Sequence, residues 1–165
     1  FTGLSNSGKT TLTKLLYNFI RKSNKIKIIN IDGDRFRKKI RNFDYDNKSR
    51  VLVGNQKIKF ATMLRKKGYN VIVSGVAPDK KWRKKNKKII NFFEIYLSCS
   101  FKETLKRNKL QTKKAFLNKN QNIIGRNHPY EEGYSKDLTI NTSKLNKIES
   151  IKKITRFLKK KKLIH

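Results

Sequence analysis

The sequence predicts an α/β protein in which a mostly parallel sheet carries helices on both faces. Short apolar segments of strand type alternate with amphipathic segments of helical period along the whole chain. No internal repeat and no Pro/Gly/Ser-rich linker interrupts this alternation. With 165 residues, 36% of them hydrophobic, the chain has room for one compact domain with a sizeable core. We therefore expect residues 1–165 to form a single domain.

The order of the elements follows from the spacing of the apolar residues. The first helix is expected to begin near Lys9, with an apolar face made of Leu12, Leu15, Leu16, Phe19 and Ile20. The further elements are a strand over Lys25–Ile31, a helix over Arg50–Lys67 ended by Gly68, strands over Tyr69–Ser74 and Phe92–Ser98, a candidate strand over Asp137–Asn141, and a last helix carrying Leu145, Ile148, Ile151, Ile154 and Leu158. The first strand of the sheet would lie mostly upstream of Phe1, so this N-terminal strand is expected to be truncated.

The chain is strongly basic, with 43 Lys and Arg residues against 11 Asp and Glu residues and a formal net charge of +32. Such a balance favours polyanionic partners in general. The lysines, however, are spread along the chain, and the abundant residues Lys, Asn and Ile all have A/T-rich codons. We therefore expect no dedicated nucleic-acid binding, although the positive field should attract a small anionic nucleotide.

The compartment is inferred from what the sequence lacks. A single cysteine, Cys99, rules out a disulfide framework within the chain. The apolar runs are far shorter than a membrane span, and no signal-peptide pattern opens the sequence. We expect a cytoplasmic protein with no membrane partner.

Residues Gly3 to Thr10 match the pattern G-x-x-x-x-G-K-[ST] in full. Glycines at both ends let such a loop wrap so that backbone N–H groups point at a phosphate chain, and the following helix adds the positive end of its dipole. Lys9 can then reach the β- and γ-phosphate oxygens, while the Thr10 hydroxyl can ligate Mg²⁺. The pattern predicts that a nucleoside triphosphate is bound by Gly3, Ser5, Asn6, Ser7, Gly8, Lys9, Thr10 and Thr11.

Asp32, Gly33 and Asp34 follow the strand expected over Lys25–Ile31, at the place where α/β sheets present residues to a ligand crevice. A carboxylate there can order the Mg²⁺ shell and take the proton of an attacking hydroxyl. We favour Asp34 for this catalytic role, together with Lys9, because Asp34 opens a basic helical stretch. The same residues also suit an Asp-Gly turn with helix-capping aspartates, so both interpretations stay open.

The chain resembles the adenylyl-sulfate kinases almost from end to end. FTGLSNSGKTTL is similar to the phosphate-loop segment of that family, INIDGDRFR to its Leu-Asp-Gly-Asp-Asn-x-Arg segment, and GRNHPYEEGYSKDLTINT to its Gly-x-Asp-x-Pro-Tyr-Glu…Asp-Leu-x-x-Asn-Thr segment. The resemblance implies a three-layer P-loop nucleoside triphosphate hydrolase/kinase fold. It also implies ATP and Mg²⁺ as cofactors and phosphorylation of the 3′-hydroxyl of adenosine 5′-phosphosulfate (APS). We expect a small nucleotide as the partner, with a homodimer as a possible assembly.

The resemblance also implies roles for individual residues. Phe43 is placed like the aromatic residue that packs on the APS adenine, and Arg107 like an arginine that lies against the adenine or the phosphates of ATP. A mobile lid is expected around Lys109–Asn127. The implied acceptor-binding residues are Asp34, Arg37, Phe43, Arg50, Lys113 and Ile123.

The departures from the family pattern fall on the acceptor side. The family segment Glu-Asn-Ile-Arg-Arg, which touches APS, reads Val-Gly-Asn-Gln-Lys over Val53–Lys57, and Ile123 stands where the family has the second aromatic residue around adenine. An aliphatic side chain keeps an apolar face but loses stacking, and an Arg-to-Lys exchange is not neutral at an anion site. The acceptor is therefore either APS or another nucleotide-linked small molecule, such as a cytidine diphosphate derivative.

Three further functions stay open at this level. They are a kinase for a sugar or a shikimate-like alcohol, a P-loop protein that binds nucleic acid, and a nucleotide sensor that does not transfer phosphate. Acceptor-dependent ADP release separates the kinases from the sensor. A steep fall of duplex affinity with salt identifies a nucleic-acid protein.

Overall fold

The structure is a computed structural model that describes all residues except 23–25, 91, 108–123, 127, 132–135 and 165. The helices are α1 (Lys9–Lys22), α2 (Gly33–Lys39), α3 (Asn47–Lys66), α4 (Lys80–Ile90), α5 (Phe101–Lys106) and α7 (Lys147–Lys160). The strands are β1 (Ile28–Ile31), β2 (Asn70–Val73), β3 (Glu94–Ser98) and β4 (Lys136–Asn141). The predicted alternation of strands and helices is confirmed.

The described strands form two parallel pairs that the first residues of the chain join. β1 pairs with β2, from Ile28 opposite Asn70 to Ile31 opposite Val73, and β3 pairs with β4 with a register irregularity at its start. Thr2 N donates to Ile95 O at 3.0 Å, Leu97 N donates to Thr2 O at 2.9 Å, and Gly75 N donates to Phe1 O at 3.1 Å. Residues 1–2 therefore lie between β2 and β3, where the end of the first predicted strand belongs.

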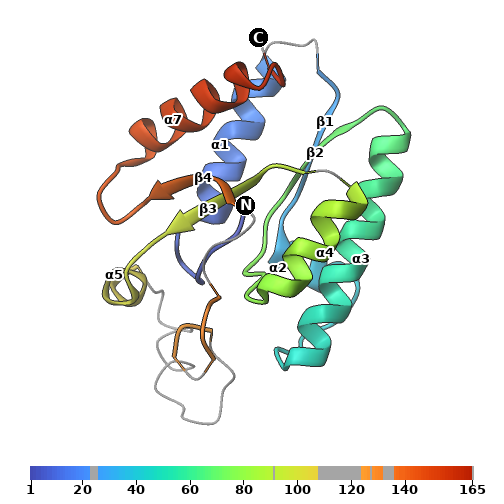
Figure 1. Cartoon of the computed structure of the whole chain (residues 1–165), viewed down its shortest axis with the longest axis vertical. Helices are drawn as coiled ribbons and strands as arrows, with labels where there is room; N and C mark the ends of the chain where they lie inside the picture. Colours follow the sequence, from blue (N-terminus) through green and yellow to red (C-terminus); the bar gives the residue numbers. More distant parts are fainter. Residues whose placement is uncertain (23–25, 91, 108–123, 127, 132–135, 165) are drawn as a thin grey trace.

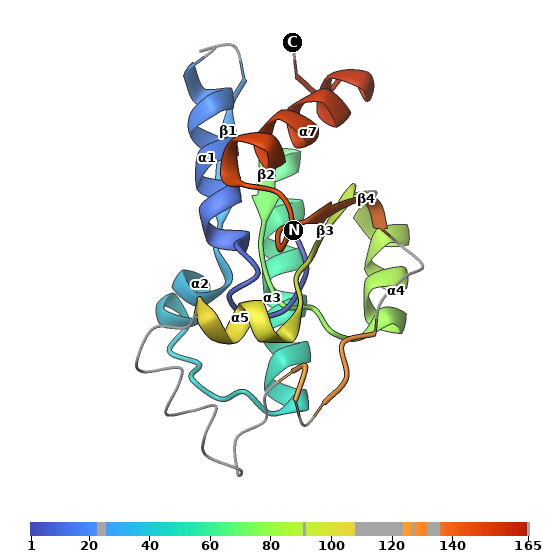
Figure 2. The ribbon, with the colours of Figure 1, turned by 90° about the vertical axis from the view of Figure 1, so that its left-hand side faces the viewer.

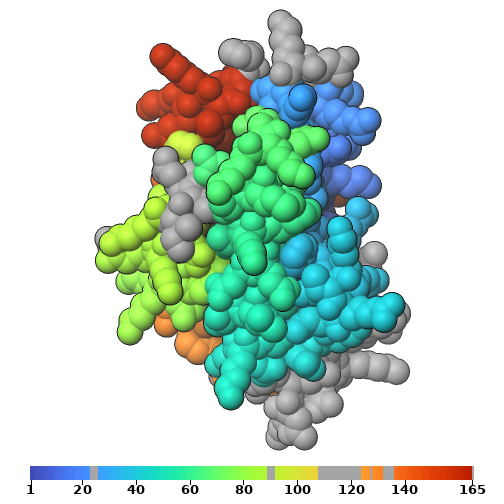
Figure 3. Space-filling view, turned by 90° about the vertical axis from the view of Figure 1, so that its right-hand side faces the viewer, coloured from blue at the N-terminus to red at the C-terminus, as the bar shows by residue number. Residues whose placement is uncertain are grey.

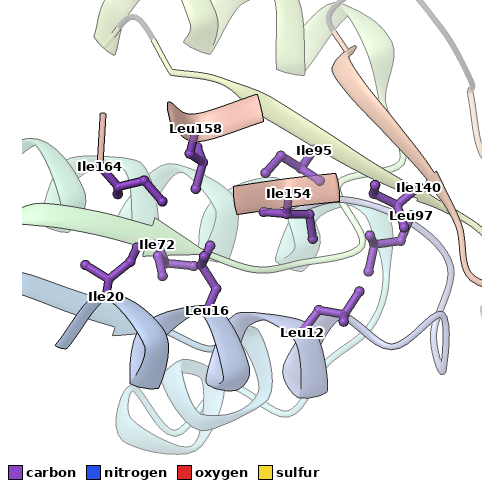
Figure 4. Packing of buried hydrophobic residues seen from close by; sticks show 10 residues of the cluster. All are labelled: Leu12, Leu16, Ile20, Ile72, Ile95, Leu97, Ile140, Ile154, Leu158 and Ile164. Carbon is purple, nitrogen blue, oxygen red and sulfur yellow. The ribbon is translucent and has the colours of Figure 1, made fainter. Parts of the chain in front are cut away.

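Helices cover both faces of this sheet, as predicted. In Figure 1, α1 and α7 lie on one side of the strands, and α3 and α4 lie on the other. Figure 3 shows α3 running along the second face beside α4. The larger core is built from α1, α7 and the inner strands, with Leu16, Leu97 and Ile154 at its centre (Figure 4). A smaller core around Ile31, Ala61 and Leu64 seats α3. Each fully buried side chain of this size stabilises the fold by roughly 1.5–3 kcal/mol.

The apolar faces of the first and last helices are narrower than the sequence predicts. Leu12, Leu16 and Ile20 are buried, but Leu15 and Phe19 are 38% and 46% exposed. Ile148 is 68% exposed and Leu145 precedes α7, so the buried stripe of α7 rests on Ile154 and Leu158. A helix that packs on one side buries only a stripe of its surface, which is why a complete helical period overstates the contact face.

The second long helix begins earlier than predicted. Asp46 caps α3, because its side chain accepts a hydrogen bond from Ser49 N at 2.9 Å. The first turn, Asn47–Arg50, has only polar side chains, so it adds no apolar residue to the helical pattern of the sequence. The expected helix start at Arg50 is therefore three residues too late.

Helix α4 was not predicted from the sequence. Its segment, KKWRKKNKKII, is dominated by lysine and contains few apolar residues. Polar residues anchor the helix instead, since Arg83 and Asn86 are only 2% and 5% exposed. Arg83 pairs with buried Glu94 of β3 at 3.1 Å. The spacing of apolar residues cannot predict an ion pair between two residues that lie 11 positions apart in the chain.

Three segments of the chain meet at one edge of the sheet. The loop over residues 3–8, the start of α2 and the residues after β2 all follow the carboxyl ends of parallel strands. Figures 1 and 2 both place α2 and α5 at this same end of the molecule. Parallel sheets present ligand sites at this edge. Within the described residues, no helix is long and apolar enough to cross a membrane.

Candidate active site

The loop between residue 2 and α1 has the backbone conformation that its glycines permit. Gly3 has φ +136°, and a Cβ added there would lie 2.6 Å from Leu97 O, so a side chain is excluded by contact as well as by conformation. Gly8 has φ +96° and Asn6 has φ +60°. Ser7 N donates to Leu4 O at 3.2 Å, which closes the turn. The loop therefore wraps directly onto the N-terminus of α1.

This loop holds polar groups whose bonding capacity is unused. Asn6 Nδ2 and Ser7 Oγ are buried and find no hydrogen-bond partner in the described part of the chain. Lys9 Nζ folds back and donates to Gly3 O at 3.0 Å and Leu4 O at 2.6 Å. Burial lowers the pKa of Lys9 to about 8, an effect that the negative charge of Asp34 partly opposes. Unused donors and a buried ammonium at a helix N-terminus fit an anionic phosphate chain.

A side-chain hydrogen bond joins Thr10, in the first turn of α1, to Asp32, the residue that caps α2. Thr10 Oγ1 donates to Asp32 Oδ2 at 2.7 Å, and Ser74 Oγ donates to the same oxygen at 3.4 Å. Asp32 also caps α2 by accepting from Asp34 N and Arg35 N, each at 3.2 Å. Burial alone would raise the pKa of Asp32, but these hydrogen bonds outweigh it and hold the pKa below its ordinary value.

The hydroxyl and carboxylate oxygens of Thr10 and Asp32 are the type of ligand that Mg²⁺ prefers. In the parts of the chain that are described, no group of three or more His, Cys, Asp or Glu side chains could hold a metal ion. This agrees with the usual coordination of Mg²⁺, in which one or two protein groups act together with substrate phosphates and water. The residues therefore fit Mg²⁺ bound with a nucleotide. Sequence reasoning favoured Asp34 and did not single out Asp32, although its capping role was one of the interpretations left open.

A cavity of about 910 Å³ opens on the phosphate loop. Its far wall is formed by Arg107, Thr142 and the start of α7 at Asn146. Arg107 donates from Nη2 to Thr142 O at 2.5 Å, and Thr142 Oγ1 in turn donates to Ser7 O at 3.0 Å. Thr142 thus ties the arginine to the loop, a link across 135 residues that sequence reasoning missed.

A second cavity, of about 980 Å³, meets the first at Asp34. Ser5, Asn6, Gly33, Asp34, Gly75 and Val76 line both cavities. The carboxylate of Asp34 is exposed to this shared space, and its charge acts on Lys9. The structure therefore brings Asp34 to the junction of the two cavities, while Lys9 lines the first cavity and feels the charge of Asp34.

The second cavity is lined by several cations of α2 and α3. Arg37 is only 8% exposed, donates to Asn42 Oδ1 at 2.7 Å and to Asp44 O at 2.6 Å, and lies 4.5 Å from the centre of the Tyr45 ring. Arg50 donates to Tyr45 O at 2.7 Å. Burial, and then the positive charge of Arg37, lower the pKa of Arg50. Positive groups that repel one another around a cavity favour an anionic ligand.

Aromatic and aliphatic side chains also line the second cavity. Phe43 lines it and is 64% exposed, while Ile124 is 5% exposed and lines the same cavity. Trp82 of α4 was not singled out from the sequence, yet it lines the cavity and its Nε1 donates to Asn55 Oδ1 at 2.9 Å. Lys113 and Ile123, and all of the predicted lid except Ile124 to Arg126, lie outside the described residues.

Comparisons with known proteins agree with this geometry. The sequence profile described as adenylylsulphate kinase matches residues 1–141. Cytidine diphosphoramidate kinase of Campylobacter jejuni is 32% identical over 150 residues, which cover 90% of this chain and 87% of that enzyme. A probable adenylyl-sulfate kinase of Archaeoglobus fulgidus is 31% identical over 146 residues, covering 87% of this chain and 94% of the relative.

The fold is shared with a solved structure, the Mycobacterium tuberculosis APS kinase CysC in complex with AMPPNP and APS. The TM-score is 0.85 at 22% identity, and the match covers 96% of this chain and 95% of that one. The P-loop kinase fold expected from the resemblance is thereby confirmed. The profile match over most of the chain, taken with the phosphate loop and the two joined cavities, places this protein in the adenylylsulphate kinase family, as a phosphotransferase that acts on a hydroxyl group.

Proposed function

We propose that this chain transfers the γ-phosphoryl group of ATP to the ribose 3′-hydroxyl of a nucleotide whose other end is anionic, with APS as the first candidate. The observation that supports this most directly is the position of Asp34 between the two cavities. One cavity has a phosphate cradle, and the other has cations and an aromatic residue. A donor nucleotide and an acceptor nucleotide can thus meet at one carboxylate.

Each side chain has a defined task in this reaction. Asp34 accepts the proton of the acceptor hydroxyl, whose oxygen bonds to the γ-phosphorus while the bond to the β,γ-bridging oxygen breaks and ADP leaves. Lys9 exchanges its contacts with Gly3 O and Leu4 O for phosphate oxygens and balances their charge. Arg37 and Arg50 hold the anionic end of the acceptor. Mg²⁺ would be held by Thr10 and Asp32, and it supplies charge neutralisation on the phosphates.

A cytidine diphosphate conjugate is the second candidate acceptor. It is favoured by the similarity to the cytidine diphosphoramidate kinase and by the altered segment Val53–Lys57 in α3. The cavity is lined by the aliphatic Ile124 as well as by the aromatic residues Phe43, Tyr45 and Trp82. When one face of the base packs on an aliphatic side chain, a one-ring base loses less stacking energy than adenine, because it has less ring area to stack.

The test is an acceptor panel with ATP and Mg²⁺, in which ADP release is measured and the position of the new phosphate is read by NMR. We expect APS, with phosphate on the 3′-oxygen, to exceed a water blank, and the Asp34→Asn variant to lose this turnover. Turnover with cytidine diphosphoramidate alone would favour the second candidate instead. Nucleotide binding without transfer to either acceptor would overturn the proposal and favour a sensor. The homodimer and the cytoplasmic location expected from the sequence stay predictions.

A further inference from the structure

Lys57 of α3 directs its ammonium group to the floor that the two cavities share. Its Nζ donates to Ser74 O, at the end of β2, at 3.1 Å. A Cβ added to Gly75 would lie 2.6 Å from this Nζ, and one added to Gly33 would lie 3.6 Å from it. Gly33 and Gly75 line both cavities, so the ammonium sits where donor and acceptor meet.

The charges that act on Lys57 come from α2 and its capping residue. Asp32 and Asp34 stabilise its positive form, whereas Arg37 opposes it. Lys57 also acts on Lys9, whose pKa its charge helps to lower. Two ammonium groups therefore lie near the wall shared by the two cavities: Lys9, at the start of α1, lines the first cavity and Lys57, in α3, lines the second.

The site of Lys57 is unfavourable for a cation without a ligand. Burial, and then the charge of Arg37, lower the pKa of Lys57 to about 8. In the described structure the bond to Ser74 O uses one of its three donors, and no ion pair is formed with Asp32 or Asp34. A cation that is kept close to two carboxylates and yet paired with neither has donors available for an anion.

We propose that Lys57 is a catalytic residue that donates to the transferring phosphoryl group from the acceptor side, opposite Lys9. This rests on the proposed function. Arg37 and Arg50 are held farther out by their contacts with Asn42, Asp44 and Tyr45, so they serve the remote end of the acceptor. Lys57 instead reaches the position between the two substrates, where charge on the phosphoryl oxygens is greatest during transfer.

The kinetic test compares Lys57→Met with Lys59→Met, an exposed lysine two residues along the same helix. Lys57→Met should lower kcat about a hundredfold, raise the KM for ATP about tenfold and change the acceptor KM less than about threefold, since the missing donor contacts the γ-phosphoryl group in the bound nucleotide and more strongly in the transition state. Lys59→Met should match the wild type. A rise of the acceptor KM alone would overturn the proposal, because it would place Lys57 on the bound acceptor rather than on the phosphoryl group.

A stability measurement separates this role from a structural one. Removing a poorly solvated cation should leave the melting temperature of Lys57→Met equal to or above that of the wild type. A loss of both stability and activity would show that the contact with Ser74 O is structural. In that case Lys57→Gln, which keeps an amide donor without the charge, decides the question: normal turnover in this variant would overturn the proposal.

A binding test needs no acceptor, so its result is distinguishable from a failure of the proposed function. Calorimetry should show that Lys57→Met weakens binding of a non-hydrolysable ATP analogue about tenfold and leaves ADP binding within about twofold. Lys59→Met should change neither. If both nucleotides lose affinity equally, or neither does, Lys57 does not contact the γ-phosphoryl group and the proposal is wrong, whatever the acceptor panel shows.

Discussion

The two cavities that meet at Asp34 are built in different ways. The donor cavity is formed largely by one short segment, the phosphate loop and the start of α1, closed by Arg107 and the residues around Thr142. The acceptor cavity takes side chains from α2, the segment before α3, α3 itself, the loop after β2 and residues near Pro129. In the donor cavity, the phosphate loop and the start of α1 present mainly backbone and one lysine, Lys9. The other cavity presents side chains from distant parts of the chain.

This difference explains where the chain departs from its relatives. Backbone N–H groups bind phosphate in the same way whatever the side chains, provided that Gly3 and Gly8 keep their conformations. A wall of separate side chains can be altered one residue at a time without disturbing the fold. The unusual segment Val53–Lys57 lies on such a wall. The departures from the family pattern therefore fall in the cavity that we propose for the acceptor.

The largest effect is expected at the one essential side chain of the donor cavity. Lys9→Met should lower kcat by roughly 10²–10³-fold with either acceptor, because it removes a charged donor to the transferring phosphate. Lys14→Met, an exposed lysine on the same helix, should have no effect. Steady-state ADP release measures both variants. A defect confined to one acceptor would contradict the separation of donor and acceptor functions.

The next effect concerns the support of the acceptor cavity. Arg83 pairs with Glu94 and donates to Ala77 O, Pro78 O and Glu131 O, so it fixes two segments that line this cavity. Arg83→Met leaves the Glu94 carboxylate buried without its ion pair, and urea unfolding should show a loss of about 3–5 kcal/mol.

The matched control for this support is the more exposed pair of Lys87 with Asp137 at 2.6 Å, whose side chains are 30% and 25% exposed. Lys87→Met should cost no more than about 1 kcal/mol in the same measurement, because solvent screens this pair. Equal losses of unfolding free energy in the two variants would show that the buried Arg83–Glu94 pair supports the acceptor cavity no more strongly than an exposed pair would.

The smallest effect is expected at the aromatic residue of the acceptor cavity. Phe43→Ala should raise the acceptor KM about tenfold, as expected for the loss of one base-stacking face, and leave the KM for ATP unchanged. Phe19→Ala removes a comparably exposed ring from α1, outside both cavities, and serves as the control. An increased KM for ATP in Phe43→Ala would contradict the assignment of the second cavity to the acceptor.

Much of the donor side could be predicted from the sequence because its information is local. The phosphate loop, the start of α1 at Lys9 and the strand at Asp137–Asn141 depend on glycine positions and on apolar period, which a short window contains. The position of Asp34 next to the loop followed from the rule that parallel strands end at one edge. The capping role of Asp32 was also foreseen as one of two interpretations.

The sequence by itself thus determined the α/β class, the phosphate loop and the order of most elements, since these follow from residue spacing. The tertiary structure alone decided that lysine-rich α4 is a helix held by Arg83, that Thr142 holds Arg107 against the loop, and that Lys57 donates to Ser74 O beside the wall shared by the two cavities. These contacts join residues far apart in the chain. They depend on which side chains the packed sheet brings within a few ångströms, and no local pattern contains that information.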